Sequence, residues 1–241
     1  AAVLMLALVL ITSCFVGGTF AKYVTSGIGG DVARVAKFGV TVTATNNSMF
    51  KTTYETDDQQ VKAAGISASV KTTTHDNLVA PGTKADDVVM LSIAGKPEVA
   101  VNVKLTIDDK MDVFLKAGTY PDFTTAAAND TFTLAQDYHP VVFTLKQNGE
   151  VKKTGTLHQI KEYLDGENGI SVNCEPNVDL STVGTLAFSL SWEWAFEGND
   201  QADTLLGNLA ASNQFNGVNV AVSDYSTAIA VVLKATVTQI D

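Results

Sequence analysis

The sequence predicts an all-β protein, an antiparallel jelly-roll-like β-sandwich with one or two short helical excursions. Three observations favour this class. Apolar and polar residues alternate along many short segments, only five prolines interrupt 241 residues, and strand patterns do not alternate regularly with helix patterns. A two-residue period turns one face of a strand toward a core and the other toward water, so many such segments predict two packed sheets.

Residues 1–21 are uncharged and largely apolar, and they end in small residues. This pattern predicts a signal peptide that is cleaved between Ala21 and Lys22, with Thr19 at the -3 position. The basic residues that normally precede such a run are missing, so we interpret the leader as lacking its start. Two alternatives remain open: a retained membrane helix, and a lipidated N-terminus at Cys14.

Residues 22–36 begin with a Gly- and Ser-rich stretch, which predicts a flexible segment. An alternating pattern between Val32 and Val42 makes this region a possible donor strand for a neighbouring copy, or else the first strand of its own domain. Residues 37–241 carry no composition break, and we interpret them as one β-sandwich domain.

Four segments have the clearest strand alternation, and six shorter segments are weaker candidates. The clear ones are 38–45, 99–107, 186–196 and 229–237. The weaker ones are 50–55, 67–71, 88–93, 111–116, 141–146 and 170–173.

The segment 186–196 places six large apolar side chains on one face: Leu186, Phe188, Leu190, Trp192, Trp194 and Phe196. A face this apolar needs a second layer to cover it. We therefore expect the two tryptophans to lie in the core and not to form a sugar-binding platform.

Helix and turn signals are few. Thr156 is a candidate N-cap for a helix that ends at Gly166, and Asn199 or Asp200 is a candidate N-cap for a helix over the following dozen residues. Asn148-Gly149 predicts a tight hairpin turn.

The formal net charge is -10 and the isoelectric point is about 4.7. An acidic surface repels phosphate, which argues against nucleic-acid binding. Once the leader is removed, Cys174 is the only cysteine, so no internal disulfide is expected, and we interpret this thiol as a buried core residue.

No catalytic or metal-binding motif is present. The three histidines are far apart, and none occurs in a zinc-ligand spacing such as HExxH. We therefore predict no enzyme activity and no cofactor. The one cluster of oxygen ligands contains Glu197, Asn199, Asp200 and Asp203. It is a weak metal candidate, with adventitious calcium as its ligand, but helix capping explains it better.

Several stretches resemble the TasA/camelysin-like family of exported proteins with a SipW-type signal peptide. The leader ends in Gly17, Gly18, Thr19, Phe20 and Ala21, as leaders in that family do. ARVAKFGVTVTA, LVAPGTKADDVVMLSIAGKPEVAVNV and the Trp-containing strand with NDQADTLLGN are also similar. The resemblance implies a jelly roll, a Gram-positive bacterium and, for some members, extracellular fibres of the biofilm matrix.

Taken together, the sequence predicts a secreted structural protein of the extracellular matrix or cell surface. We expect a fibre subunit that assembles by strand addition, with itself or other matrix proteins as partners. A signal peptidase would act on it during export, and it would contact the membrane only through the leader. The alternatives are a cell-surface adhesion or ligand-binding module and, less favoured, a secreted metalloprotease.

Overall fold

The computed structural model describes residues 33–241 except 46–48, 75, 127–128, 212–213 and 216–217. Contacts divide the chain into two units, residues 1–35 and 36–241, and the elements below belong to the second. Within the described residues, no helix has the length and apolarity needed to cross a membrane.

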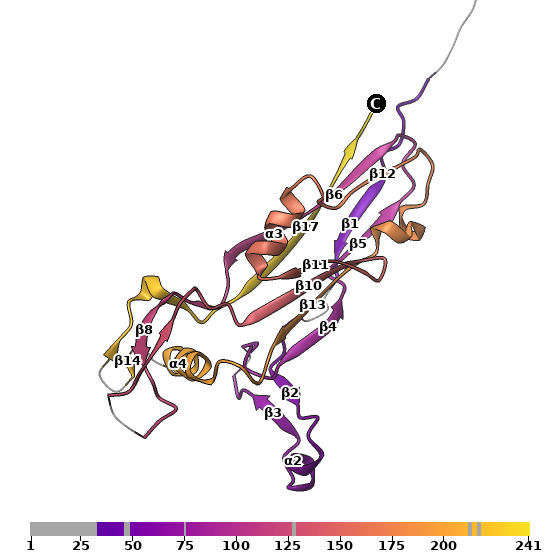
Figure 1. The fold of residues 1–241 in the computed structure, drawn as a ribbon. Coiled ribbons are helices and arrows are strands. Elements are labelled where there is room, and N and C mark those ends of the chain that lie inside the picture. Colours follow the sequence, from indigo (N-terminus) through magenta and orange to yellow (C-terminus); the bar gives the residue numbers. More distant parts are fainter. Residues whose placement is uncertain (1–32, 46–48, 75, 127–128, 212–213, 216–217) are drawn as a thin grey trace, which may run out of the picture. The chain divides into compact units, whose positions relative to one another are not determined.

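The largest sheet has four antiparallel strands in the order β11-β10-β13-β4 (Figure 1). Its members are β4 (Lys84–Val88), β10 (Val141–Gln147), β11 (Glu150–Gly155) and β13 (Phe188–Trp194). Asn148 and Gly149 connect β10 to β11 with φ angles of 52° and 78°, the left-handed values that a two-residue hairpin turn requires. The predicted tight turn is therefore confirmed.

A second sheet has three antiparallel strands in the order β12-β6-β17, and a separate ladder joins β1 to β5. These strands are β12 (Ser171–Cys174), β6 (Val101–Met111), β17 (Ala230–Gln239), β1 (Val40–Ala44) and β5 (Leu91–Gly95). Part of β5 lies beside β17, but no ladder joins the two strands.

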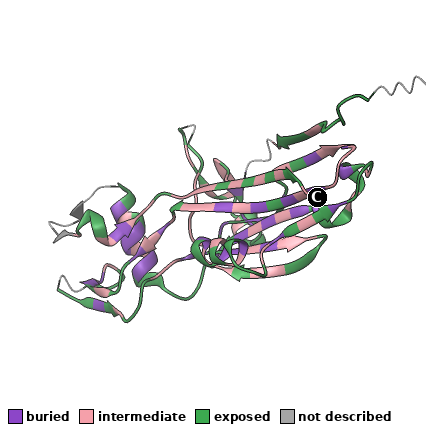
Figure 2. Ribbon diagram, turned by 90° about the horizontal axis from the view of Figure 1, so that it is seen from above, coloured by how far each residue is buried: buried purple, intermediate pink, exposed green. Residues whose placement is uncertain are grey.

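One hydrophobic core takes side chains from both larger sheets. Phe143 and Trp192 from the four-stranded sheet are fully buried, as are Val103 and Leu105 from β6. Buried positions alternate with less buried ones along the long strands (Figure 2). The indole Nε1 of Trp192 donates a hydrogen bond to the carbonyl oxygen of Met49 at 2.8 Å, so its polar atom is satisfied. The prediction that the tryptophans belong to the core is confirmed.

Two longer helices form where the sequence predicts them. Helix α3 (Leu157–Asp165) begins after Thr156, whose side chain accepts a hydrogen bond from the Gln159 N–H while the Gln159 side chain accepts one from the Thr156 N–H. Its buried face consists of Leu157, Ile160 and Leu164. Helix α4 (Asp200–Ala211) buries Leu205, Leu206 and Leu209.

Short elements complete the described part of the chain. The two-stranded ladders pair β2 (Thr53–Glu55) with β3 (Ala68–Lys71), β7 (Phe114–Leu115) with β16 (Tyr225–Ser226), β8 (Gly118–Pro121) with β9 (Thr131–Leu134), and β14 (Gln214–Phe215) with β15 (Val218–Asn219). The short helical turns are α2 (Gln59–Ala63), η1 (Leu180–Thr182), η2 (Gly184–Leu186) and η3 (Val222–Asp224).

This content confirms the all-β class with few short helices, whereas the jelly-roll topology stays a prediction. Three details of the predicted strands are wrong. The segment 111–116 is not one strand, because Met111 ends β6 and Phe114 begins β7. The segment 88–93 is not one strand, because Val88 ends β4 and Leu91 begins β5. Phe196 does not share the buried face of β13: the strand ends at Trp194, and the Phe196 side chain is 71% exposed.

Candidate functional site

The four predicted oxygen ligands lie at the start of α4, but in two different environments. Glu197, Asn199 and Asp200 are exposed, whereas Asp203 is buried. Asn199 directly precedes the helix, and its carbonyl oxygen accepts a hydrogen bond from the Asp203 N–H at 2.9 Å. Asp200 and Asp203 thus occupy the first turn of α4, where negative charge interacts favourably with the helix dipole.

Asp203 connects α4 to the end of the Trp-containing strand. Its Oδ1 accepts hydrogen bonds from the Tyr138 hydroxyl at 2.8 Å and from the Trp194 indole Nε1 at 3.1 Å. Burial raises the pKa of the Asp203 carboxyl, and burial together with the neighbouring carboxyl raises the pKa of Tyr138. The sequence does not reveal this contact, since Tyr138 lies 65 positions away from Asp203.

The four predicted oxygen ligands are only weak candidates for a metal site. In the described part of the chain, no three His, Cys, Asp or Glu side chains are arranged to hold a metal ion. The predicted cleavage site, Ala21 and Lys22, lies outside the described residues, as does Cys14.

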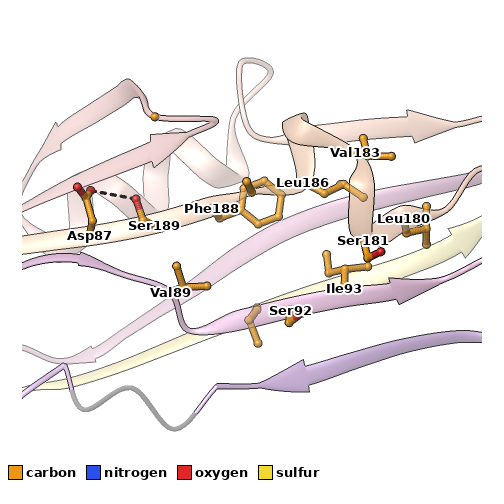
Figure 3. A pocket seen from close by; sticks show the side chains of 13 residues that line it. Asp87, Val89, Ser92, Ile93, Leu180, Ser181, Val183, Leu186, Phe188 and Ser189 are labelled. Atoms are coloured by element: carbon orange, nitrogen blue, oxygen red, sulfur yellow. Dashed lines mark hydrogen bonds between the residues drawn. The ribbon is translucent and has the colours of Figure 1, made fainter.

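An apolar groove, which the sequence did not predict, lies between β5 and the segment that leads into β13 (Figure 3). Its volume is about 400 Å³. One wall consists of Val89, Leu91 and Ile93, and side chains from η1, η2 and the start of β13 form the other: Leu180, Val183, Leu186 and Phe188. The two walls come from segments about 90 residues apart in the chain, 89–93 and 180–188, so strand alternation alone could not reveal the groove.

Asp87 provides a polar end to this groove. Its φ angle of 47° is in the left-handed region, at a point where the register between β13 and β4 shifts. Its Oδ1 accepts hydrogen bonds from Lys146 Nζ at 2.7 Å and from Ser189 Oγ at 3.1 Å, the second of which is drawn in Figure 3. The hydrogen bond from Lys146 is the main reason why the pKa of Asp87 is lowered.

Next to the groove, β1 is an exposed strand that, within the described residues, pairs with β5 alone. Four of its five residues are exposed, including Val42 and Ala44, which the alternation placed in the core. The Thr45 N–H donates to the Met90 carbonyl oxygen at 2.9 Å. Because successive backbone groups of a strand point to opposite sides, the N–H groups of Val42 and Ala44 point away from β5.

The same reasoning applies to β5 and β17. The peptide groups of Leu91 and Ile93 point away from β1. The Ile240 N–H donates to the Ala100 carbonyl oxygen at 3.0 Å, so the peptide group of Ile240 points toward β6. By alternation along the strand, the peptide groups of Leu233, Ala235 and Val237 point away from β6. Within the described residues, β5 and β17 therefore each have one edge without a ladder.

Comparisons with known proteins leave the site to be judged by its geometry alone. No protein-family model, curated protein or solved structure matches this chain.

Proposed function

We propose that this protein is an exported structural subunit that assembles outside the cell by strand addition. In this proposal, cleavage between Ala21 and Lys22 frees residues 22–36, and this segment of one copy pairs with the open edges of β5 and β17 in the next. The observation that carries the proposal is that, within the described residues, β5 and β17 each have one edge without a ladder. Unpaired N–H and C=O groups along such edges accept an added strand.

The side chains along β17 also favour an added strand. Its apolar positions Val231, Leu233, Ala235 and Val237 are only partly buried, whereas Val101, Val103, Leu105 and Ile107 of the neighbouring β6 are buried. An added strand with its own apolar side chains would reduce this exposure. Full burial of one Val or Leu side chain contributes about 1.5–3 kcal/mol, so several partly exposed positions provide a driving force for assembly.

The proposal also limits which residues can act as the donor. Val40–Ala44 already pairs with β5 of the same chain, so residues from Val40 onward are the first strand of their own domain. The donor segment is then confined to residues before Val40. The described residues 33–39 form no helix or strand, and all are exposed.

Localisation and processing follow from the leader. The resemblance to TasA/camelysin-like proteins supports a secreted matrix or cell-surface protein of a Gram-positive bacterium, with a signal peptidase as its partner during export. We propose no enzyme activity and no cofactor.

The test is negative-stain electron microscopy of three purified proteins. One begins at Lys22, one begins at Lys37, and the third keeps its length but has residues 22–36 replaced by Gly and Ser. We expect filaments from the first alone, because the third can span the same distance but lacks the donor side chains. Filaments from the protein that begins at Lys37 would contradict the proposal.

A second candidate function is a monomeric cell-surface module that binds an apolar ligand in the groove of Figure 3. The groove volume of about 400 Å³ is within the range of small-molecule sites. A protein that remains monomeric as the full mature chain would favour this function over assembly.

A further inference from the structure

Two histidines and several carboxylates meet at the far end of β6, away from the groove. His158 lies in the first turn of α3, and its Nδ1 is 2.6 Å from Oδ2 of Asp109. Its other ring nitrogen, Nε2, is 3.4 Å from Oε1 of Glu162. A neutral imidazole carries one N–H, so it can donate to one of these carboxylates only. The doubly protonated ring donates to both.

His139 has a related environment. Its Nδ1 is 3.4 Å from Oδ2 of Asp112, three residues beyond Asp109 along the chain. This nitrogen is buried and has no hydrogen-bond partner among the residues that the structure describes. A buried polar atom without a partner costs free energy.

Both histidines line the same hollow, whose volume is about 540 Å³. The residues that surround it come from the segment 136–139 and from the first two turns of α3. Asp109 lies near the end of β6, and Asp112 directly follows this strand. Protonation of His158 would therefore act where α3 meets the end of β6.

The other charged groups around this hollow are mostly acidic. The end of β6 adds Asp108 and Lys110, which pair with each other. The loop before His139 adds Asp137, whose carboxylate accepts a hydrogen bond from the Ala117 N–H. On α3, Lys161 is paired with Asp165. The two lysines near the rings thus have acidic partners of their own.

We propose that this hollow is a pH-responsive clamp, in which protonation of His158 ties the start of α3 to Asp109 of β6. The pKa of His158 is raised, chiefly by its hydrogen bond to Asp109, which agrees with this geometry. A raised pKa in the folded state adds stability below the ordinary histidine pKa of about 6.5. That stability is lost as pH rises through the raised value.

The hollow also adjoins a contact with α4. Tyr138 directly precedes His139, and its hydroxyl donates to Asp203 of α4. This inference does not depend on the proposed assembly, since it concerns a single copy.

The test is thermal unfolding of the mature chain between pH 6 and pH 8.5, where histidines are the main titrating side chains. We expect the melting temperature of the wild type to fall as pH rises. His158→Gln should lose most of this fall, whereas His75→Gln is the matched control and should keep it. An unchanged pH dependence in His158→Gln would overturn the proposal.

A second measurement keeps the test valid if His158→Gln fails to fold. Proton NMR follows the ring signal of His158 in the wild type and in Asp109→Asn. We expect a higher pKa for His158 than for a free histidine, a lower one after the substitution, and faster amide exchange in the first turn of α3 at pH 8.5 than at pH 6. Equal His158 titrations in both proteins would contradict the clamp.

Discussion

β13 and β1 have the same alternating pattern in the sequence but differ in the structure. In β13, Phe188, Leu190, Trp192 and Trp194 are all buried, and ladders hold the strand on both sides. In β1, Val42 and Ala44 are exposed, and one ladder to β5 holds the strand. Alternation therefore predicts an extended backbone, while burial depends on whether a second layer and two neighbours are present.

Truncation of Trp192 should produce the largest effect. Trp192→Ala removes a fully buried ring that packs against Phe50, at a centroid distance of 5.2 Å, and against Tyr54. We expect a loss of about 3–5 kcal/mol in the free energy of unfolding, measured by urea denaturation. A loss below about 1 kcal/mol would mean that β13 is not the centre of the core.

Asp203 should come next, because it holds the end of β13 to α4. Asp203→Ala leaves the Tyr138 hydroxyl and the Trp194 N–H without their acceptor, and should cost about 1–3 kcal/mol by the same assay. Asp203→Asn is the matched control. Since the folded-state pKa of Asp203 is raised, its contribution to stability is lost as pH rises through that value. The free energy of unfolding of Asp203→Asn should therefore rise relative to that of the wild type between pH 4 and pH 7. A difference between the two proteins that does not change with pH would contradict the raised pKa.

Two proline variants should distinguish the two edges of β1. The N–H of Thr43 points toward β5, whereas that of Ala44 points away. We expect Thr43→Pro to cost about 1–2 kcal/mol through the lost ladder bond. Ala44→Pro should remain within about 0.5 kcal/mol of the wild type. Equal losses in the two variants would show that β1 is paired on both sides.

The smallest effect should come from Val42→Thr. The new side chain keeps the β-branched shape, and the site is 38% exposed. We expect a change within about 0.5 kcal/mol, in contrast to a clearly larger loss for Leu190→Thr at a buried position of β13. Similar losses at the two positions would remove the difference between the strands.

The sequence predicted local features well. Thr156 and Gly166 mark the ends of α3, and Asn148-Gly149 forms the predicted hairpin turn between β10 and β11. These features could be predicted because each depends on residues only a few positions apart. The alternation in 186–196 likewise located β13.

Features that depend on distant partners could not be predicted. The break between β4 and β5 follows the left-handed backbone of Asp87, which Lys146 and Ser189 stabilise from other strands. The contact of Asp203 with Tyr138 and the walls of the groove likewise join segments that are far apart in the chain. The acidic segment 197–203 was correctly placed at a helix start, but the sequence does not distinguish its buried carboxylate from the exposed ones.

Amide hydrogen exchange, compared between monomeric and assembled mature protein, tests strand addition most directly. If a second copy adds its strand to the open edges of β5 and β17, the N–H groups of Ile93, Leu233 and Ala235 should exchange much more slowly after assembly. Those of Val42 and Ala44, on the outer edge of β1, should not change. Assembled protein in which Ile93, Leu233 and Ala235 exchange as fast as in the monomer would contradict the account.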